Sequence, residues 1–148
     1  MGAQLVQSLL RGNSVFAIHR DLIKCYDSTP ASAFQLIAVD SKYTIPTQEG
    51  LNKLLAEVQT NHFHYTAETF DCDDFALAFK SLSNIFFGIN GIGWVLNFSG
   101  QHSYNVVFTH DQGELSLSVV EPQQDATVAK TQQIDHYAWK PKEGLVIL

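Results

Sequence analysis

The stretch Phe70-Asp71-Cys72-Asp73-Asp74-Phe75-Ala76 places a thiol at the expected start of a helix and surrounds it with three carboxylates. Asp71 is a favourable N-cap residue, and the acidic residues after the cysteine lie in the first turn, where carboxylates offset the positive end of the helix dipole. The apolar residues that follow recur at helical spacing, which predicts a helix from Cys72 to about Phe87 with Cys72 on its inner face. A buried structural cysteine is rarely surrounded by this much charge.

The first turn of a helix is a place where a cysteine can become reactive. Unpaired backbone N–H groups and the dipole stabilise a thiolate there, and they lower a thiol pKa from about 8.5 to roughly 3.5–7.5. The neighbouring Asp side chains act in the opposite direction, because negative charge disfavours a thiolate. An activated Cys72 therefore needs a compensating positive charge, which is either a histidine cation or a bound metal ion.

A β-hairpin is expected further along the chain, and it supplies a histidine. His102 opens a run rich in β-branched and aromatic residues that ends at Thr109, and the segment from Glu114 to Glu121 alternates apolar with polar residues. A four-residue loop after Thr109 pairs Thr109 with Glu114. The same register places His102 opposite Glu121, and a three-residue loop shifts the pairing by one residue. His110 is a rival candidate, but it lies in the turn, at the far end from Glu121.

A thiol at a helix N-terminus, followed by an imidazole and a carboxylate on adjacent strands, is the arrangement of papain-like cysteine hydrolases. In this arrangement His102 takes the thiol proton and later protonates the leaving group, while Glu121 holds the ring in one tautomer. Attack by Cys72 on a carbonyl forms an acyl-enzyme. The backbone N–H of Cys72 contributes to an oxyanion hole, and the second donor stays open among Gln101, Asn105 and upstream polar residues.

Three short motifs carry a closer resemblance to a known family. The stretches Phe70–Ala76, His102–Val107 and Val120–Gln123 resemble the C-terminal papain-like cysteine protease domain of agglutinins of the Marasmius oreades type. The resemblance covers roughly Tyr43 to Gln124. Agglutinins of this type carry an N-terminal sugar-binding β-trefoil, and residues 1 to 42 are too few for such a domain, so lectin activity is not implied.

The resemblance implies roles for individual residues. It implies Cys72 as nucleophile, His102 as base and Glu121 as third member of a triad. It also implies a divalent cation beside the site, and oxygen ligands of this kind suit Ca²⁺ or Mn²⁺. The positions that match the metal-binding motif are Asp73, Asp74 and Gln123.

Several of these residues also have simpler structural explanations. Capping alone accounts for Asp71, and most carboxylates at strand ends are only solvated. His62 and His64 are weak metal candidates without a further ligand motif, and they are interpreted as loop or strand residues. Cys25 is expected to be free and inert if Cys72 is the nucleophile.

Composition predicts one soluble domain and limits its partners. The chain has 148 residues, with 9 basic and 15 acidic side chains that give a net charge of −6. No basic stripe is present to meet phosphates, which argues against a nucleic-acid partner. No apolar run approaches the roughly 20 residues of a membrane span, and Met1 to Asn13 does not match a signal peptide. The whole chain, residues 1–148, is therefore expected to form a single papain-like domain.

The coarse pattern of elements predicts an α+β fold, with N-terminal helices packed on a C-terminal antiparallel sheet. A short helix is expected at Leu5–Leu10 and a longer one at Thr47–Gln59. Strands are expected at Trp94–Phe98 and in the hairpin, with His136–Trp139 and Leu145–Leu148 completing the sheet. The expected active site lies between the two layers.

The functional prediction is a cysteine hydrolase, a peptidase or amidase that depends on a divalent cation and acts on a peptide or protein substrate. One alternative is a cell-wall amidase or transferase with the same thiol chemistry. The other is a non-catalytic binding or structural module that keeps the papain-like fold. The resemblance also suggests a homodimer.

Overall fold

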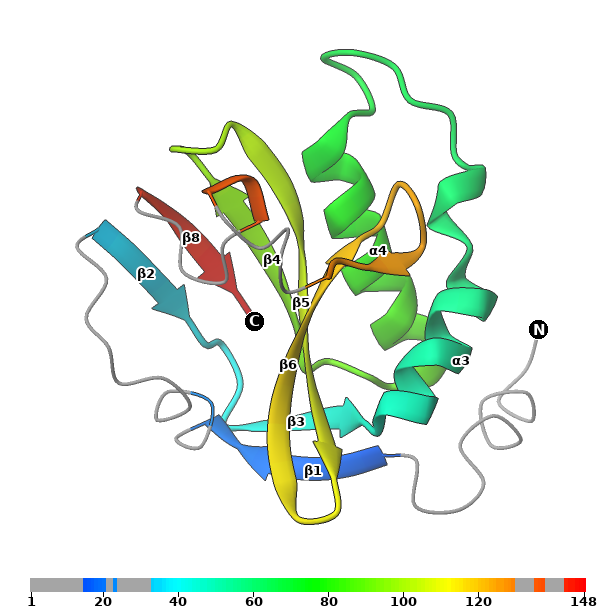
Figure 1. The fold of residues 1–148 in the computed structure, drawn as a ribbon, viewed down its shortest axis with the longest axis vertical. Coiled ribbons are helices and arrows are strands. Elements are labelled where there is room, and N and C mark those ends of the chain that lie inside the picture. Colours follow the sequence, from blue (N-terminus) through cyan, green and yellow to red (C-terminus); the bar gives the residue numbers. More distant parts are fainter. Residues whose placement is uncertain (1–14, 21–22, 24–32, 130–134, 138–142) are drawn as a thin grey trace.

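The computed structural model describes residues 15–20, 23, 33–129, 135–137 and 143–148 (Figure 1). The described strands are β1 (Val15–His19), β2 (Ala33–Ile37), β3 (Lys42–Pro46), β4 (Ile92–Asn97), β5 (His102–Asp111), β6 (Glu114–Glu121), β7 (Ala126–Thr127) and β8 (Glu143–Ile147). The described helices are α3 (Gln48–Val58) and α4 (Cys72–Phe87), with short 3-10 helices at Thr60–His62 and Asp135–Tyr137.

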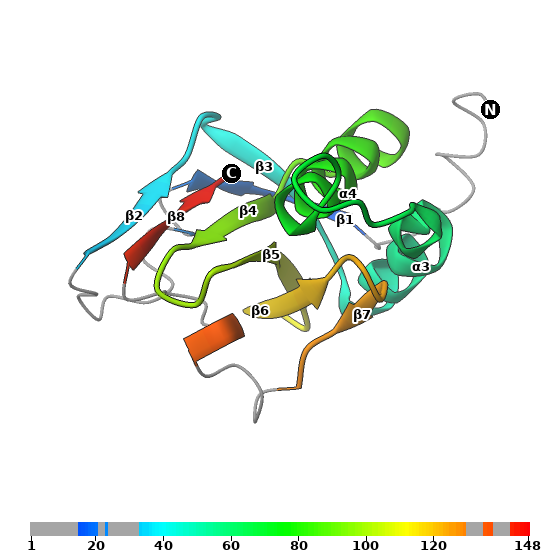
Figure 2. The same ribbon diagram turned by 90° about the horizontal axis from the view of Figure 1, so that it is seen from above.

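Most of the strands belong to one mixed sheet with the order β2-β8-β4-β5-β6-β7. Strand β2 is parallel to β8, whereas the remaining neighbours are antiparallel. Strands β1 and β3 pair in a separate antiparallel sheet. Figures 1 and 2 show α3 and α4 together on one face of the large sheet, with the small sheet crossing near the turn of the β5–β6 hairpin.

Strand β5 lies at the centre of the core. Its seven residues from Ser103 to Thr109 are all buried, so both faces of the strand are covered. On one face, Val107 packs in a cluster with leucines of α3 and Phe79 of α4. On the other face, Tyr104 and Val106 pack with residues of the neighbouring strands. A strand covered on both faces has buried residues at consecutive positions, and here they include the polar Ser103, Asn105 and Thr109 as well as apolar side chains.

A buried amide connects the helix layer to the sheet. The Nδ2 group of Asn105 in β5 donates to the backbone oxygen of Ala76 in α4 at 2.9 Å and to that of Gly93 in β4 at 3.2 Å. The Lys80 ammonium of α4 donates to the backbone oxygen of Ile92 at 2.7 Å. These polar contacts fix the position of α4, and so of Cys72, relative to the strand that carries His102.

The predicted helix from Cys72 to Phe87 is confirmed, because α4 has these bounds. It ends where Gly88 adopts a left-handed backbone conformation with φ of 67°, and the Gly88 N–H bonds back to the oxygen of Asn84 at 2.9 Å. The predicted helix at Thr47–Gln59 is confirmed with its ends trimmed by one residue each. The Thr47 hydroxyl caps α3 by accepting from the N–H of Gly50 at 3.0 Å.

The prediction of N-terminal helices on a C-terminal antiparallel sheet is wrong. Strands β1, β2 and β3 precede α3 in the chain, and β2 lies in the large sheet, where it runs parallel to β8. The segment expected as a strand at His136–Trp139 instead begins within a 3-10 helix. Short apolar segments are ambiguous between helix and strand, and their pairing is decided by distant partners. The predicted helix at Leu5–Leu10 lies outside the described residues, as does Cys25.

The hairpin is present, but its predicted register is wrong by two residues. Asp111 pairs with Glu114, and Thr109 pairs with Ser116, so the loop consists of Gln112 and Gly113 alone. Both loop residues have positive φ, at 50° and 85°, as a tight hairpin turn of the primed type requires. A shift by an even number of residues leaves each side chain on its predicted face of the sheet.

The Asn105 hydrogen bonds to α4 and β4, called the amide bridge below, generate a prediction about stability. Replacing Asn105 by Ala removes two buried hydrogen bonds and leaves a cavity between α4 and β5, so we expect the free energy of unfolding to fall by about 2–4 kcal/mol. Urea denaturation monitored by circular dichroism measures the change. The exposed Asn52→Ala is the matched control and is expected to change stability by less than about 0.5 kcal/mol. Equal effects of the two substitutions would show that the bridge does not hold α4.

Candidate functional site

The start of α4 is organised by the carboxylates around Cys72. Asp71 is the N-cap residue; its carboxylate accepts from the N–H of Glu68 at 3.2 Å. The Asp74 carboxylate accepts from the N–H of Asp71 at 3.3 Å, which is the reciprocal half of a capping box. Capping therefore gives Asp74 a structural role as well as Asp71, and the metal role expected for Asp74 stays a prediction.

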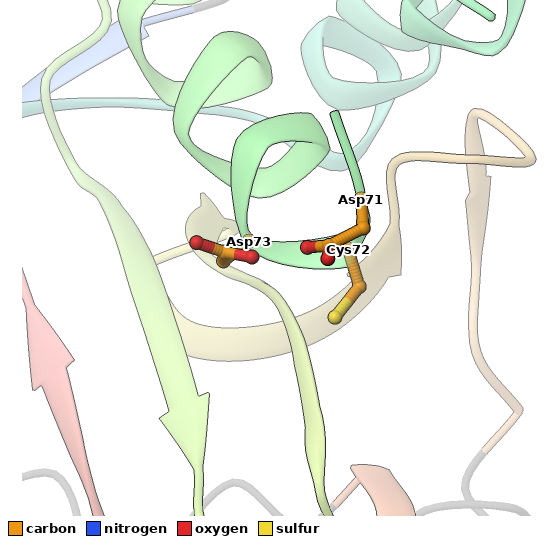
Figure 3. Close-up of side chains that lie close together, drawn as sticks. All are labelled: Asp71, Cys72 and Asp73. Atoms are coloured by element: carbon orange, nitrogen blue, oxygen red, sulfur yellow. The ribbon is translucent and has the colours of Figure 1, made fainter. Parts of the chain in front are cut away.

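Asp73 forms a compact cluster with Asp71 and Cys72. One potential ligand atom from each residue lies within 4.8 Å of the other two. In Figure 3 the Asp71 carboxylate is directed across the start of the helix towards Asp73, while the sulfur extends beyond the helix end. A hydrogen bond from Asp73 lowers the pKa of Asp71, and the same bond, with burial and negative charge, raises the pKa of Asp73. The protonation of each carboxyl group thus depends on the other.

The environment of Cys72 keeps its thiol protonated. Burial raises the pKa of the thiol above its ordinary value, and the negative charges of Asp71 and Asp73 raise it further. The N–H of Ser103 hydrogen-bonds to the sulfur and acts in the opposite direction, without reversing the shift. The positive end of the helix dipole is therefore outweighed at this position.

His102 and Glu121 form a direct contact in spite of the shifted hairpin register. The Nε2 atom of His102 lies 2.8 Å from Oε2 of Glu121, and both side chains are largely buried, with exposed fractions of 10% and 5%. The two residues are diagonal neighbours on the same face of the sheet, which is within reach of long side chains. The prediction that they lie close together is confirmed.

Two further donors hold the Glu121 carboxylate. The Tyr137 hydroxyl donates to Oε2 at 2.9 Å, and the backbone N–H of Gln123 donates to Oε1 at 3.1 Å. Burial alone would raise the pKa of Glu121, but the hydrogen bonds from His102, Gln123 and Tyr137 outweigh it and lower the pKa. Burial and the adjacent carboxylate raise the pKa of Tyr137 to about 12.

Sequence reasoning did not find the aromatic residues around this pair. The His136 ring stacks on the His102 ring at a centroid distance of 4.2 Å, and Tyr137 contacts the His102 ring edge-on at 5.3 Å. Both residues come from the 3-10 helix at Asp135–Tyr137, which has no periodic sequence signal. The only hint was their aromatic character near the end of the chain.

The predicted site residues fall into two groups. Cys72 and Asp73 lie at the start of α4, where the sulfur meets the N–H of Ser103 in β5. His102, which directly precedes Ser103 in β5, contacts Glu121 at the end of β6. The backbone N–H of Gln123 bonds to the same Glu121 carboxylate. Ser103 is the point at which the two groups meet.

Comparison with known families and structures identifies relatives of the chain. Residues 14–146 match the model of a family described as the ricin-type β-trefoil lectin C-terminal domain. A solved structure titled "PSL1a-E64 complex" has 21% identity and a TM-score of 0.58, and the match covers 87% of this chain and 51% of that one. A Polyporus squamosus lectin, bound to the human-type influenza-binding epitope Neu5Acα2-6Galβ1-4GlcNAc, has 22% identity and a TM-score of 0.52, with coverage of 88% and 49%. No curated protein matches the chain.

These matches correct the functional predictions. The chain spans about half the length of the two solved chains, and the matching family is a lectin family rather than one of papain-like proteases. The predicted papain-like protease domain, its fold and its activity as a cysteine peptidase or amidase are therefore wrong, and a peptide or protein substrate is not supported.

The physical reason for the error lies in the shortness of the three motifs. Each motif is also accounted for by a local structural role. Asp71 and Asp74 cap α4, and Glu121 is a buried acceptor for three donors. Cys72 retains its thiol proton.

Among the described residues, no helix is long and apolar enough to cross a membrane.

The lowered pKa of Glu121 generates a prediction about pH. A carboxylate with a folded-state pKa below its ordinary value near 4.5 stabilises the fold above that value, and the contribution is lost as the pH falls through the folded-state pKa. We expect Glu121→Gln to lower the free energy of unfolding at pH 7 by about 1–3 kcal/mol. We also expect it to flatten the dependence of stability on pH below pH 5. Urea denaturation between pH 3 and pH 7 measures both effects.

Tyr137→Phe is the control for this substitution, because it removes one donor and leaves the charge. Tyr137→Phe is expected to lower the free energy of unfolding at pH 7 by less than Glu121→Gln does. It is also expected to keep the loss of stability at acidic pH. An unchanged pH profile in Glu121→Gln would mean that this carboxylate does not contribute.

Proposed function

Because the chain belongs to the family of ricin-type β-trefoil lectin C-terminal domains, we propose that it is a non-catalytic binding module of a carbohydrate-binding lectin. The observation that carries the proposal is the family match over residues 14–146. The trisaccharide named for the Polyporus squamosus lectin supports a carbohydrate as the ligand. This chain corresponds to about half of that lectin, so the proposal extends carbohydrate binding to this half.

The electrostatics at the start of α4 support binding rather than nucleophilic attack. The thiolate is the nucleophilic form of a cysteine, and the raised pKa of Cys72 leaves little of it at neutral pH. The buried Glu121 carboxylate already has a donor on each oxygen. In this proposal Cys72, His102 and Glu121 form a polar framework that shapes the end of the sheet.

The protonated thiol gives a direct test. We expect alkylation of Cys72 by iodoacetamide to be slow at pH 7 and to rise only near or above pH 9, because the raised pKa delays formation of the thiolate. Mass spectrometry of the modified peptide measures the rate, with Cys72→Ala as the blank and His102→Ala as the comparison. His102→Ala is expected to leave the rate unchanged. A covalent adduct with E64, the compound named for the PSL1a structure, that forms at pH 7 and requires His102 would contradict the proposal.

We also propose that the carboxylates of Asp71 and Asp73 bind a divalent cation. Two carboxylates this close together are a donor set for a hard cation, since the ion relieves their mutual repulsion. Oxygen donors suit Ca²⁺ or Mn²⁺, whereas the neutral thiol of Cys72 suits neither. Asp73 was predicted from the sequence as a ligand, and Asp74 and Gln123 stay as predicted further ligands.

The cation proposal predicts a linked change in thermal stability. An ion that binds only the folded state raises Tm, by about 3–8 °C near saturation for a chain of this size. We expect this shift with Ca²⁺ at pH 7.5, and we expect it to diminish towards pH 5, because the raised pKa of Asp73 lets protons compete with the ion. Differential scanning calorimetry with and without chelator measures it.

Asp73→Asn is expected to remove the calcium-dependent shift, and the distant exposed Glu114→Gln is expected to keep it. A shift of equal size in both variants would place the ion elsewhere. No shift in the unsubstituted protein would exclude a cation site of useful affinity.

A further inference from the structure

Two clefts on the helix side of the molecule meet at one residue. A cleft of about 520 Å³ lies between α3, the 3-10 helix at Thr60–His62 and the turn that joins β6 to β7. A second cleft of about 550 Å³ lies between the following loop and α4. His62 lines both clefts. The two clefts share this lining residue, and we call them together the His62 groove.

One end of the His62 groove is lined by amide side chains. Asn52 of α3, Gln59, Asn61 and Gln124 all line this cleft. Within the described residues, none of these four side chains has a hydrogen-bond partner. A planar amide presents donors and an acceptor side by side, and it can bond two neighbouring hydroxyl groups at once. Four such groups line this cleft, all on exposed residues and without partners among the described residues.

The backbone beneath these amides is held in place. The Asp125 carboxylate accepts from the N–H groups of Thr60 and Asn61, at 3.1 and 3.0 Å, and from the Thr60 hydroxyl at 2.5 Å. Gln59 and Asp125 both have left-handed backbone conformations, with φ of 52° and 47°. Non-glycine residues adopt such conformations at a cost, which the surrounding contacts must offset. The amide end of the groove is thus a preorganised surface rather than a loose loop.

The other end of the groove is aromatic. Phe63 lines it with 42% of its surface exposed, and its ring meets Phe70 edge-on at a centroid distance of 5.7 Å. Phe70 in turn meets the buried Phe75 of α4 at 4.9 Å. This chain of rings anchors an exposed aromatic surface to the core. A fixed, partly exposed ring is suited to pack against the C–H face of a sugar ring.

We propose that the His62 groove binds a neutral oligosaccharide, with the amides on its hydroxyl groups and Phe63 under a sugar ring. The inference rests on the proposed function and assigns a site to it. An uncharged ligand is favoured because Asp125 lies at the amide end and the chain has a net charge of −6. The lining of the groove does not include Asp71, Cys72 or Asp73, although its Phe70 directly precedes Asp71 in the chain.

Titration calorimetry with the disaccharide Galβ1-4GlcNAc, the neutral part of the epitope named for the Polyporus squamosus lectin, tests the site. We expect the unsubstituted chain to bind this disaccharide. Asn61→Ala and Phe63→Leu are each expected to raise Kd by about tenfold or more. Phe63→Leu keeps an apolar contact with Phe70 and removes only the flat ring. The side-chain amide NMR signals of Asn61 and Gln124 are expected to shift on titration, which a purely structural role would not produce.

Matched substitutions lie outside the groove. Gln35→Ala removes an exposed amide on β2, and Phe98→Ala removes a ring that is 57% exposed; each is expected to change Kd by less than about twofold. Binding that is unaffected by Asn61→Ala and Phe63→Leu would overturn the groove and leave the proposed function standing. Binding of the sialylated trisaccharide but not of the disaccharide would also overturn the inference alone. Binding of neither sugar would overturn both.

Discussion

The burial of β5 on both faces is the constraint on which the rest of the structure depends. Seven consecutive residues of this strand are inaccessible, and it pairs with β4 on one side and β6 on the other. The Nδ2 group of its buried Asn105 donates to backbone oxygens of α4 and β4, whereas the Oδ1 atom has no hydrogen-bond partner among the described residues. Phe108, near the other end of the strand, packs with the small sheet. A single strand thereby positions the helix layer, the neighbouring strands and the small sheet.

The polar groups at the end of β5 show how similar residue types acquire different roles. The carboxylate of Glu121 is buried with three donors, and its pKa is lowered. The pKa of Asp73 is raised by its hydrogen bond with Asp71, by burial and by the nearby negative charges. The sulfur of Cys72 is close to both aspartates, which burial cannot offset because burial also favours the neutral thiol. The hydrogen-bond donors and charges around each group decide the direction in which its pKa shifts.

How far the site could be predicted depended on whether its contacts are local. The capping of α4 by Asp71 follows from short-range spacing, and the same spacing explains Asp74, which had been assigned to a metal. The proximity of His102 and Glu121 survived a two-residue error in the hairpin loop because side chains alternate between faces with a period of two. The contact of Tyr137 with Glu121 had no sequence signal, since it depends on how a distant segment returns to the sheet.

The sequence by itself determined the bounds of α3 and α4, the existence of the β5–β6 hairpin and the acidic surroundings of Cys72. These features arise from helical periodicity, capping and strand alternation, which act over a few residues. Only the tertiary structure decided that β2 joins the large sheet beside β8, and that His62 lines both an amide cleft and an aromatic one. Such contacts join segments far apart in the chain, and their partners are selected by packing of the whole core rather than by local preference.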